Sequence, residues 1–95
     1  MYSSEEIAIL KRDINEKIVA DYAPEEHKSV ISALSKLTLK HVMAQSEWNL
    51  LSARKAILTL AKGEFDQLPD LVVAAQRDFR DVIYWVWLQE KEKRQ

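Results

Sequence analysis

Apolar residues recur at helical spacing along most of the chain. The first stripe consists of Ile7, Leu10, Ile14 and Ile18. At 100° per residue these positions fall within an arc of about 80°, which is typical of a helix that packs along one seam. Ser3 and Glu6 stand ahead of the stripe at the spacing of a capping box, in which the serine oxygen and the glutamate carboxylate each accept a backbone amide. The pattern predicts an amphipathic helix that begins at Ser3.

A second stripe follows Pro24, which lacks an amide hydrogen and suits the first position of a helix. Its members are Val30, Ile31, Leu34 and Leu37. The apolar pattern then shifts by about half a turn and continues through Leu39, Val42, Met43, Leu50, Ala53, Ile57, Leu60 and Ala61. Either the chain bends around Thr38, a suitable N-cap, or residues 24–62 form one helix whose halves have neighbours on opposite faces. We favour the bend.

Gly63 predicts the end of the helix that follows the bend, because glycine enters the left-handed conformation after a helix without a steric penalty. A helix from about Thr38 to this point spans ~25 residues, or ~37 Å at 1.5 Å per residue. We expect it to form the centre of the fold. Trp48 lies on the face opposite its main stripe, so we expect this helix to be covered on both sides.

Two further helices are predicted after Gly63. Asp66 is a candidate cap for a short helix, and Asp78 with Asp81 repeats the capping-box spacing at the start of the last one. The short helix carries the apolar residues Leu68, Leu71, Val72 and Ala75. Alternating strand patterns and internal repeats are absent from the sequence. The prediction is a single all-α domain over residues 1–95, a compact bundle of four to five helices with a long central helix.

The last predicted helix contains the segment DFRDVIYWVW, residues 78–87, which holds four aromatic rings. Phe79, Val82, Ile83 and Val86 share one face of the helix and account for a buried side. Tyr84, Trp85 and Leu88 lie off that face, and Trp87 lies at its edge. A helix that is apolar most of the way round is either enclosed on all sides or has a second face for a partner.

Both interpretations of these aromatic residues are open at the level of sequence. The partner interpretation gives a candidate interface of Trp48, Tyr84, Trp85, Trp87 and Leu88. It rests on the enrichment of Trp and Tyr where a fold meets another protein. The partner is then a second copy, since a homodimer accounts for the surplus rings, or another protein. An adaptor, an inhibitor or immunity-type factor, and a regulator all fit this hypothesis.

Composition narrows the class of protein. With 47% apolar and 31% charged residues, the chain has a globular composition. The absence of Cys removes disulfides and thiolate chemistry and fits the cytoplasm, which is the expected location. The acidic N-terminal residues do not resemble a signal peptide, and no apolar segment approaches the ~20 residues of a membrane span.

The balance of charge argues against nucleic acid as the partner, because the net charge is −1. Residues 24–62 nevertheless hold six basic and three acidic side chains. A nucleic-acid-associated regulator is therefore the alternative function, with Lys36, Lys40, Arg54, Lys55 and Lys62 as the contacting residues. Glu47 interrupts the basic stripe.

Catalysis is the third hypothesis and has the least support. His27 and His41 are too far apart in sequence to place two metal ligands on one helix turn, and a single glycine cannot build a phosphate-binding loop. An enzyme would have to use Asp78, Arg80 and Asp81, without a recognisable nucleophile. We therefore expect a non-enzymatic protein without a cofactor, a metal site or a small-molecule ligand.

Overall fold

The computed structural model describes residues 2–93, and within that range it contains five α-helices and four short 3-10 turns. The helices are α1 (Ser4–Asp21), α2 (His27–Ser35), α3 (Glu47–Ala61), α4 (Leu68–Arg77) and α5 (Phe79–Lys93). No strand occurs between residues 2 and 93, so the predicted all-α class is confirmed. The radius of gyration, 12.9 Å, is close to the value of about 12 Å expected for a compact chain of this length.

The N-terminal helix begins where the capping box predicts. The amide of Glu6 donates to Ser3 Oγ over 3.1 Å, and the amide of Ser3 donates to Glu6 Oε1 over 3.4 Å. Leu10, Ile14 and Ile18 are buried along one side of α1. The first stripe therefore belongs to the core.

The predicted bend between the second and third apolar stripes is confirmed, because α2 ends at Ser35 and the chain changes direction before α3. The predicted start of the central helix near Thr38 is wrong. Two 3-10 turns, Leu39–His41 and Met43–Gln45, occupy the segment instead, and α3 begins at Glu47. The central helix is therefore 15 residues long, shorter than its predicted ~25.

Local capping explains why α3 starts so late. Ser46 is extended and its Oγ accepts the amide of Asn49 over 3.2 Å, which satisfies one of the free donors at the helix start. Just before it, Ala44 and Gln45 have φ values of 58° and 48°, in the left-handed region. Since these residues are neither glycine nor asparagine, the turn has no signature in the sequence.

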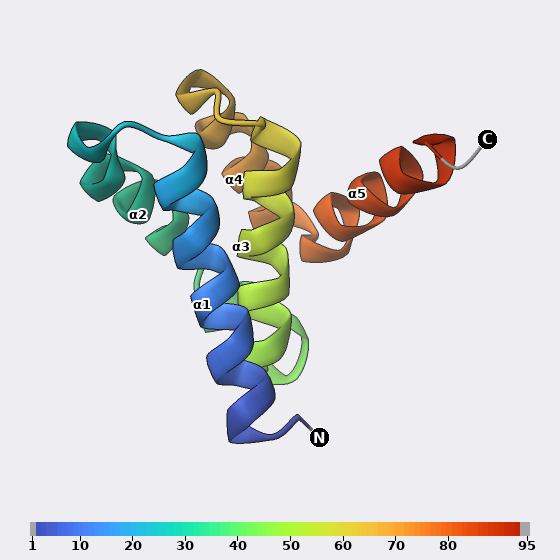
Figure 1. Ribbon diagram of the computed structural model, residues 1–95. Helices are drawn as coiled ribbons and strands as arrows, with labels where there is room; N and C mark the ends of the chain where they lie inside the picture. The colour runs from blue at the N-terminus through green and yellow to red at the C-terminus, as the bar shows by residue number, and fades with distance from the viewer. Residues whose placement is uncertain (1, 94–95) are drawn as a thin grey trace.

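Helix α3 lies at the centre of the fold, in contact with α1, α4 and α5 (Figure 1). It runs parallel to α1, since Lys11 pairs with Glu47 and Asp13 with Lys55, each over 3.2 Å. The buried apolar residues of all five helices form one cluster around it. The predicted central position of this helix is therefore correct.

Gly63 has the role that the sequence predicts. Its φ is +79°, and a Cβ added there would lie 2.9 Å from the carbonyl oxygen of Asp21 at the end of α1. The glycine thus allows the ends of α1 and α3 to touch. Lys62, with φ 52°, is also left-handed.

The short helix predicted after Gly63 is present as α4, but its predicted cap is wrong. Asp66 lies inside the 3-10 turn Phe65–Gln67, and Gln67 is the N-cap residue of α4. Pro69 falls in the first turn of α4, where its missing amide does no harm. Leu68, Val72 and Ala75 face the core.

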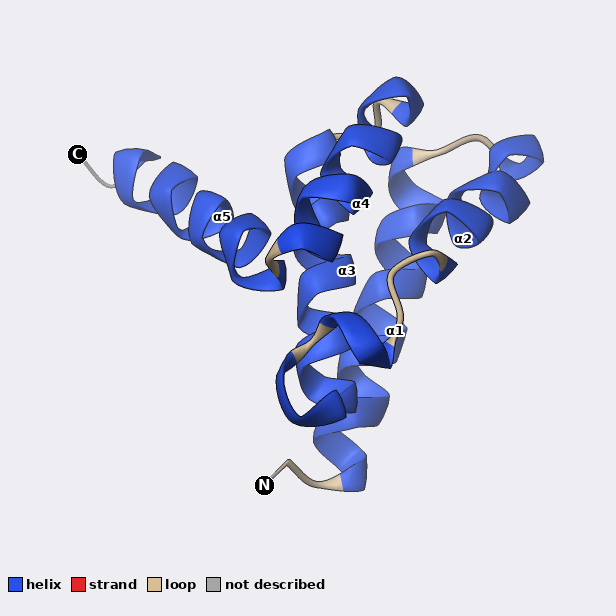
Figure 2. Cartoon of the chain, turned by 180° about the vertical axis from the view of Figure 1, so that it is seen from behind, coloured by secondary structure: helices blue, strands red, loops and turns tan. Residues whose placement is uncertain are grey.

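The C-terminal helix, α5, departs from the rest of the bundle. In Figures 1 and 2 it leaves at a steep angle, and its C-terminal half reaches away from the other four helices. Its packing contacts are with α3 and α4. No helix within residues 2–93 has the length and apolar character that crossing a membrane requires.

Candidate functional site

Helix α5 is fixed to the bundle by its first two turns and one face. The predicted cap is present in part: Asp78 Oδ1 accepts the amide of Arg80 over 3.0 Å. The predicted capping box with Asp81 is wrong, because the amide of Asp78 donates to the carbonyl of Ala74. Phe79 and Val82 are buried, and Ile83 and Val86 pack against the core while remaining partly exposed. The face predicted to be buried is therefore the face that contacts the bundle.

The surplus aromatic residues lie on the other side of α5. Tyr84 is 54% exposed, Trp85 38% and Trp87 52%, whereas Leu88 is half-buried. We call Tyr84, Trp85, Trp87 and Leu88 the outer face of α5. Of the two interpretations of these rings, enclosure within the domain is therefore wrong for Tyr84, Trp85 and Trp87.

Two contacts arrange this outer face. Tyr84 and Trp87 stack with their centroids 5.8 Å apart and their planes 19° apart. The Lys91 ammonium lies 5.1 Å from the centroid of the Trp87 ring, within range of a cation–π interaction. Lys91 was not among the predicted interface residues, although its spacing of four residues from Trp87 is the signal for a contact along a helix.

Trp48, the fifth predicted interface residue, lies elsewhere. It belongs to α3, is half-buried, and stacks on Tyr2 with the centroids 3.9 Å apart and the planes at 8°. This pairing depends on α1 and α3 running in parallel, so no local spacing in the sequence could reveal it. The predicted interface is thus divided between two surfaces.

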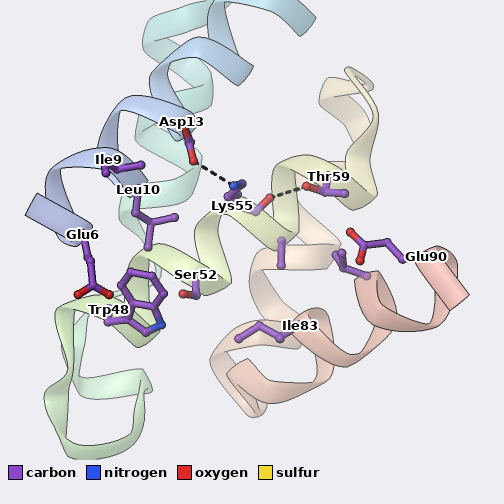
Figure 3. Close-up of a pocket in the computed structure, with 12 residues that line it drawn as sticks. Glu6, Ile9, Leu10, Asp13, Trp48, Ser52, Lys55, Thr59, Ile83 and Glu90 are labelled. Carbon is purple, nitrogen blue, oxygen red and sulfur yellow. Dashed lines mark hydrogen bonds and ion pairs between the residues drawn. The ribbon is translucent and has the colours of Figure 1, made fainter. Parts of the chain in front are cut away.

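A groove of about 340 Å³ separates those two surfaces (Figure 3). Trp48 lies on one side of it and Ile83 of α5 on the other, and Val86 of α5 also lines it. Between them, Lys55 donates to Asp13 over 3.2 Å, and Thr59 donates to the carbonyl of Lys55 over 3.0 Å. The groove is lined by both apolar and polar side chains, and the one cation among them, Lys55, already has a partner.

The carboxylates near the start of α5 do not form an acid–base pair. Arg80 donates to Asp78 from Nε and from Nη2, each over 2.9 Å. These hydrogen bonds hold the pKa of Asp78 below its ordinary value, and the same pairing raises the pKa of Arg80. A carboxyl that stays ionised is a poor general acid, and the structure gives Asp78 the role of a helix cap.

The two histidines have structural hydrogen bonds. The Nε2 of His27 lies 2.9 Å from the carbonyl of Tyr22, and Nδ1 of His41 accepts the amide of Thr38 over 3.0 Å. Each ring helps to close a turn between helices. Among residues 2–93, no three His, Asp or Glu side chains come together in a group that could hold a metal ion.

Two of the five predicted nucleic-acid contacts are used inside the fold. Arg54 is half-buried and donates from Nη2 to the carbonyl of Leu37 over 2.7 Å, and desolvation lowers its pKa. Lys55 pairs with Asp13. Lys36, Lys40 and Lys62 remain as exposed cations of the middle segment.

Comparison with known proteins gave no relative: no family model, no curated protein and no solved structure matches this chain. The functional interpretation therefore depends on the surfaces described above. Of these, the outer face of α5 departs furthest from an ordinary protein surface, because it concentrates large aromatic side chains on a helix that projects from the bundle.

Proposed function

We propose that this chain functions by binding a protein partner through the outer face of α5. The observation that carries the proposal is the exposure of Tyr84, Trp85 and Trp87 together on one projecting helix. Exposed rings contribute little to the stability of the chain that carries them. Buried in a contact, Trp and Tyr are the residue types that provide the largest share of binding energy.

The shape of the site favours a macromolecular partner over a small ligand. The outer face is the convex side of a helix, and small-molecule sites are concave and enclose most of their ligand. The role proposed is accordingly binding and not catalysis, and we place it in the cytoplasm because the chain lacks cysteine.

Nucleic acid has less support as the partner. With Arg54 and Lys55 engaged by Leu37 and Asp13, three of the five predicted cations are left to contact phosphates. A chain with a net charge of −1 also provides little electrostatic attraction for a polyanion. A gel shift at low salt tests this alternative, and retarded DNA or RNA there would favour it over the protein partner.

The proposed function is tested by substituting Trp85 with Glu and capturing partners from cells that express the chain. Val19→Glu is the matched control, because Val19 is 67% exposed and lies on α1. We expect the wild type and Val19→Glu to capture the same partners and Trp85→Glu to lose them. Equal capture by all three proteins would contradict a role for the outer face.

A further inference from the structure

Charged residues are interspersed in an ordered way among the residues of the outer face of α5. At 100° per residue, Arg80 and Lys91 lie about 40–60° to one side of its centre line, and Asp81 and Glu92 lie about 40–60° to the other. All four residues are exposed. We call Arg80 and Lys91 the basic flank and Asp81 and Glu92 the acidic flank. Opposite charges therefore lie on the two sides of the centre line through Tyr84 and Leu88, closer to it than Trp85 and Trp87.

The contacts within the chain leave the charged groups of both flanks able to pair with another molecule. Arg80 uses Nε and Nη2 for Asp78, and Nη1 is left to donate elsewhere because a guanidinium has five N–H groups. Lys91 contacts the π-face of Trp87, which does not neutralise its charge. Neither Asp81 nor Glu92 takes part in an ion pair among the described residues.

Two α5 helices place opposite charges against each other in only one relative orientation. When two α5 helices pack side by side in parallel, a two-fold axis along them places the basic flank of each copy against the acidic flank of the other. Arg80 then faces Asp81 of the second copy, and Lys91 faces Glu92. When the helices are antiparallel, each flank meets its own kind, and like charges oppose each other along the whole contact.

We infer that the partner of the outer face is a second copy of this chain, bound with the two α5 helices parallel. The inference rests on the proposed function, since it names the partner of the same surface. In this arrangement Tyr84 and Leu88 form the central seam. Trp85 lies about 80° to one side of the centre line and Trp87 about 80° to the other, so Trp85 of each copy approaches Trp87 of the other.

The position of α5 permits this pairing. Its buried face is turned toward its own bundle, and its C-terminal half reaches away from the other helices (Figures 1 and 2). A two-fold axis along the paired helices therefore places the two bundles on opposite sides. The groove shown in Figure 3 stays open in the dimer, because Ile83 and Val86 line it from the inner face of α5.

The contact is small, which sets the strength expected of it. Three half-exposed rings offer roughly 300 Å² per subunit, given that an aromatic side chain buries 150–250 Å² when fully enclosed. A standard interface takes about 800 Å² from each partner. Even with the stems of the flanking side chains added, the contact lies at the low end of this range. The dimer should be weak, with a Kd in the micromolar range or above.

Charge reversal tests both the dimer and its orientation. In the parallel dimer, Lys91→Glu sets two carboxylates against each other at both flanks, and Glu92→Lys does the same with two ammonium groups. We therefore expect the homodimer of each variant to have a Kd about tenfold or more above that of the wild-type dimer. An equimolar mixture of the two variants pairs opposite charges at both flanks, Glu with Lys in each case, and should associate more tightly than either variant alone. Mass measured by sedimentation equilibrium, from micromolar to millimolar chain, provides the Kd values.

Two exposed charges near the start of α2 provide the controls. Lys28→Glu and Glu25→Lys reverse them and should leave Kd unchanged. A tighter dimer of Lys91→Glu would overturn the parallel orientation, because the new carboxylate would then be attracted to Arg80 of the second copy in an antiparallel pair. A mixture that associates no better than the separate variants would overturn the pairing of Lys91 with Glu92.

The failure of this inference is distinguishable from failure of the proposed function. A wild-type chain that stays monomeric to millimolar concentration overturns the dimer. If Trp85→Glu still abolishes the capture of another protein, the outer face binds that protein and the proposed function stands. A dimer that tolerates both Trp85→Glu and the charge reversals associates through another surface, and the inference fails. The proposed function fails as well only if Trp85→Glu also captures the same proteins as the wild type.

Discussion

At the scale of single residues, Tyr22 carries a buried polar group that the fold does not satisfy. Tyr22 follows α1, is only 4% exposed, and buries its hydroxyl without a hydrogen-bond partner. Burial, together with the nearby charges of Asp21 and Glu26, raises the pKa of its phenol. A buried polar group without a partner costs desolvation energy that no bond returns.

Tyr22→Phe removes that cost. We expect the free energy of unfolding at neutral pH to stay unchanged or to rise by up to about 1 kcal/mol, measured by urea denaturation. In the unfolded chain the Tyr22 phenol ionises near its ordinary pKa of 10.0, and in the folded protein it ionises at a higher pH. The contribution of the protonated phenol to stability is therefore complete below pH 10.0 and is lost as the pH rises through the pKa of the folded state. Tyr22→Phe should therefore lose less stability above pH 10 than the wild type. A loss of more than about 1 kcal/mol at neutral pH would show that the hydroxyl is bonded.

The pKa of Asp78 is shifted in the opposite direction from that of Tyr22, so its contribution to stability is lost at low pH. Hydrogen bonds from Arg80 lower its pKa from the ordinary value of 3.8, so its contribution to stability is present above pH 3.8 and is lost as the pH falls through the folded pKa. An NMR titration of the carboxyl carbon should give a pKa below the ordinary value. In Arg80→Gln the pKa should move back toward that value, and an unchanged pKa would contradict the pairing.

At the scale of elements, the ends of α1 and α3 depend on Gly63. Gly63→Ala places a methyl group 2.9 Å from the carbonyl oxygen of Asp21 and forces a side chain into positive φ. We expect a loss of about 1–3 kcal/mol in the free energy of unfolding. Lys62→Gly is the control, because it removes a side chain at a left-handed position next to Gly63 and should be neutral within about 1 kcal/mol. A neutral Gly63→Ala would show that the two helix ends do not touch.

The helix starts and stops that could be predicted are those with a local chemical signal. Side chains that cap a helix bond to amides only two or three residues away, as Ser3, Glu6 and Asp78 do. Gly63 acts through its own backbone conformation. The sequence alone therefore identifies these helix ends. The segment before α3 could not be predicted in this way. Leu39 and Met43 continue an apolar pattern but are exposed, because the left-handed turn at Ala44 and Gln45 breaks the helix without a glycine. Ser46 was the overlooked signal for the start of α3.

At the scale of the whole molecule, helices α3 and α4 cover one face of α5 and leave Tyr84, Trp85 and Trp87 exposed. The sequence predicts which residues lie off the buried face, since their positions follow from helical geometry. It cannot predict the angle at which α5 leaves the bundle or the separation of Trp48 from the outer face, because both depend on packing between distant segments. The exposure of the α5 rings could therefore be anticipated, and their separation from Trp48 could not.

The central claim is that the outer face of α5 serves association and not the fold of the chain. The most direct test is to measure thermal unfolding and solution mass together for Trp85→Glu and the wild type. We predict that the substitution costs no more than about 1–2 kcal/mol of stability, while the mass at high concentration falls from dimer to monomer. A loss of about 3–5 kcal/mol, as for a buried tryptophan, with no change in mass would contradict the account.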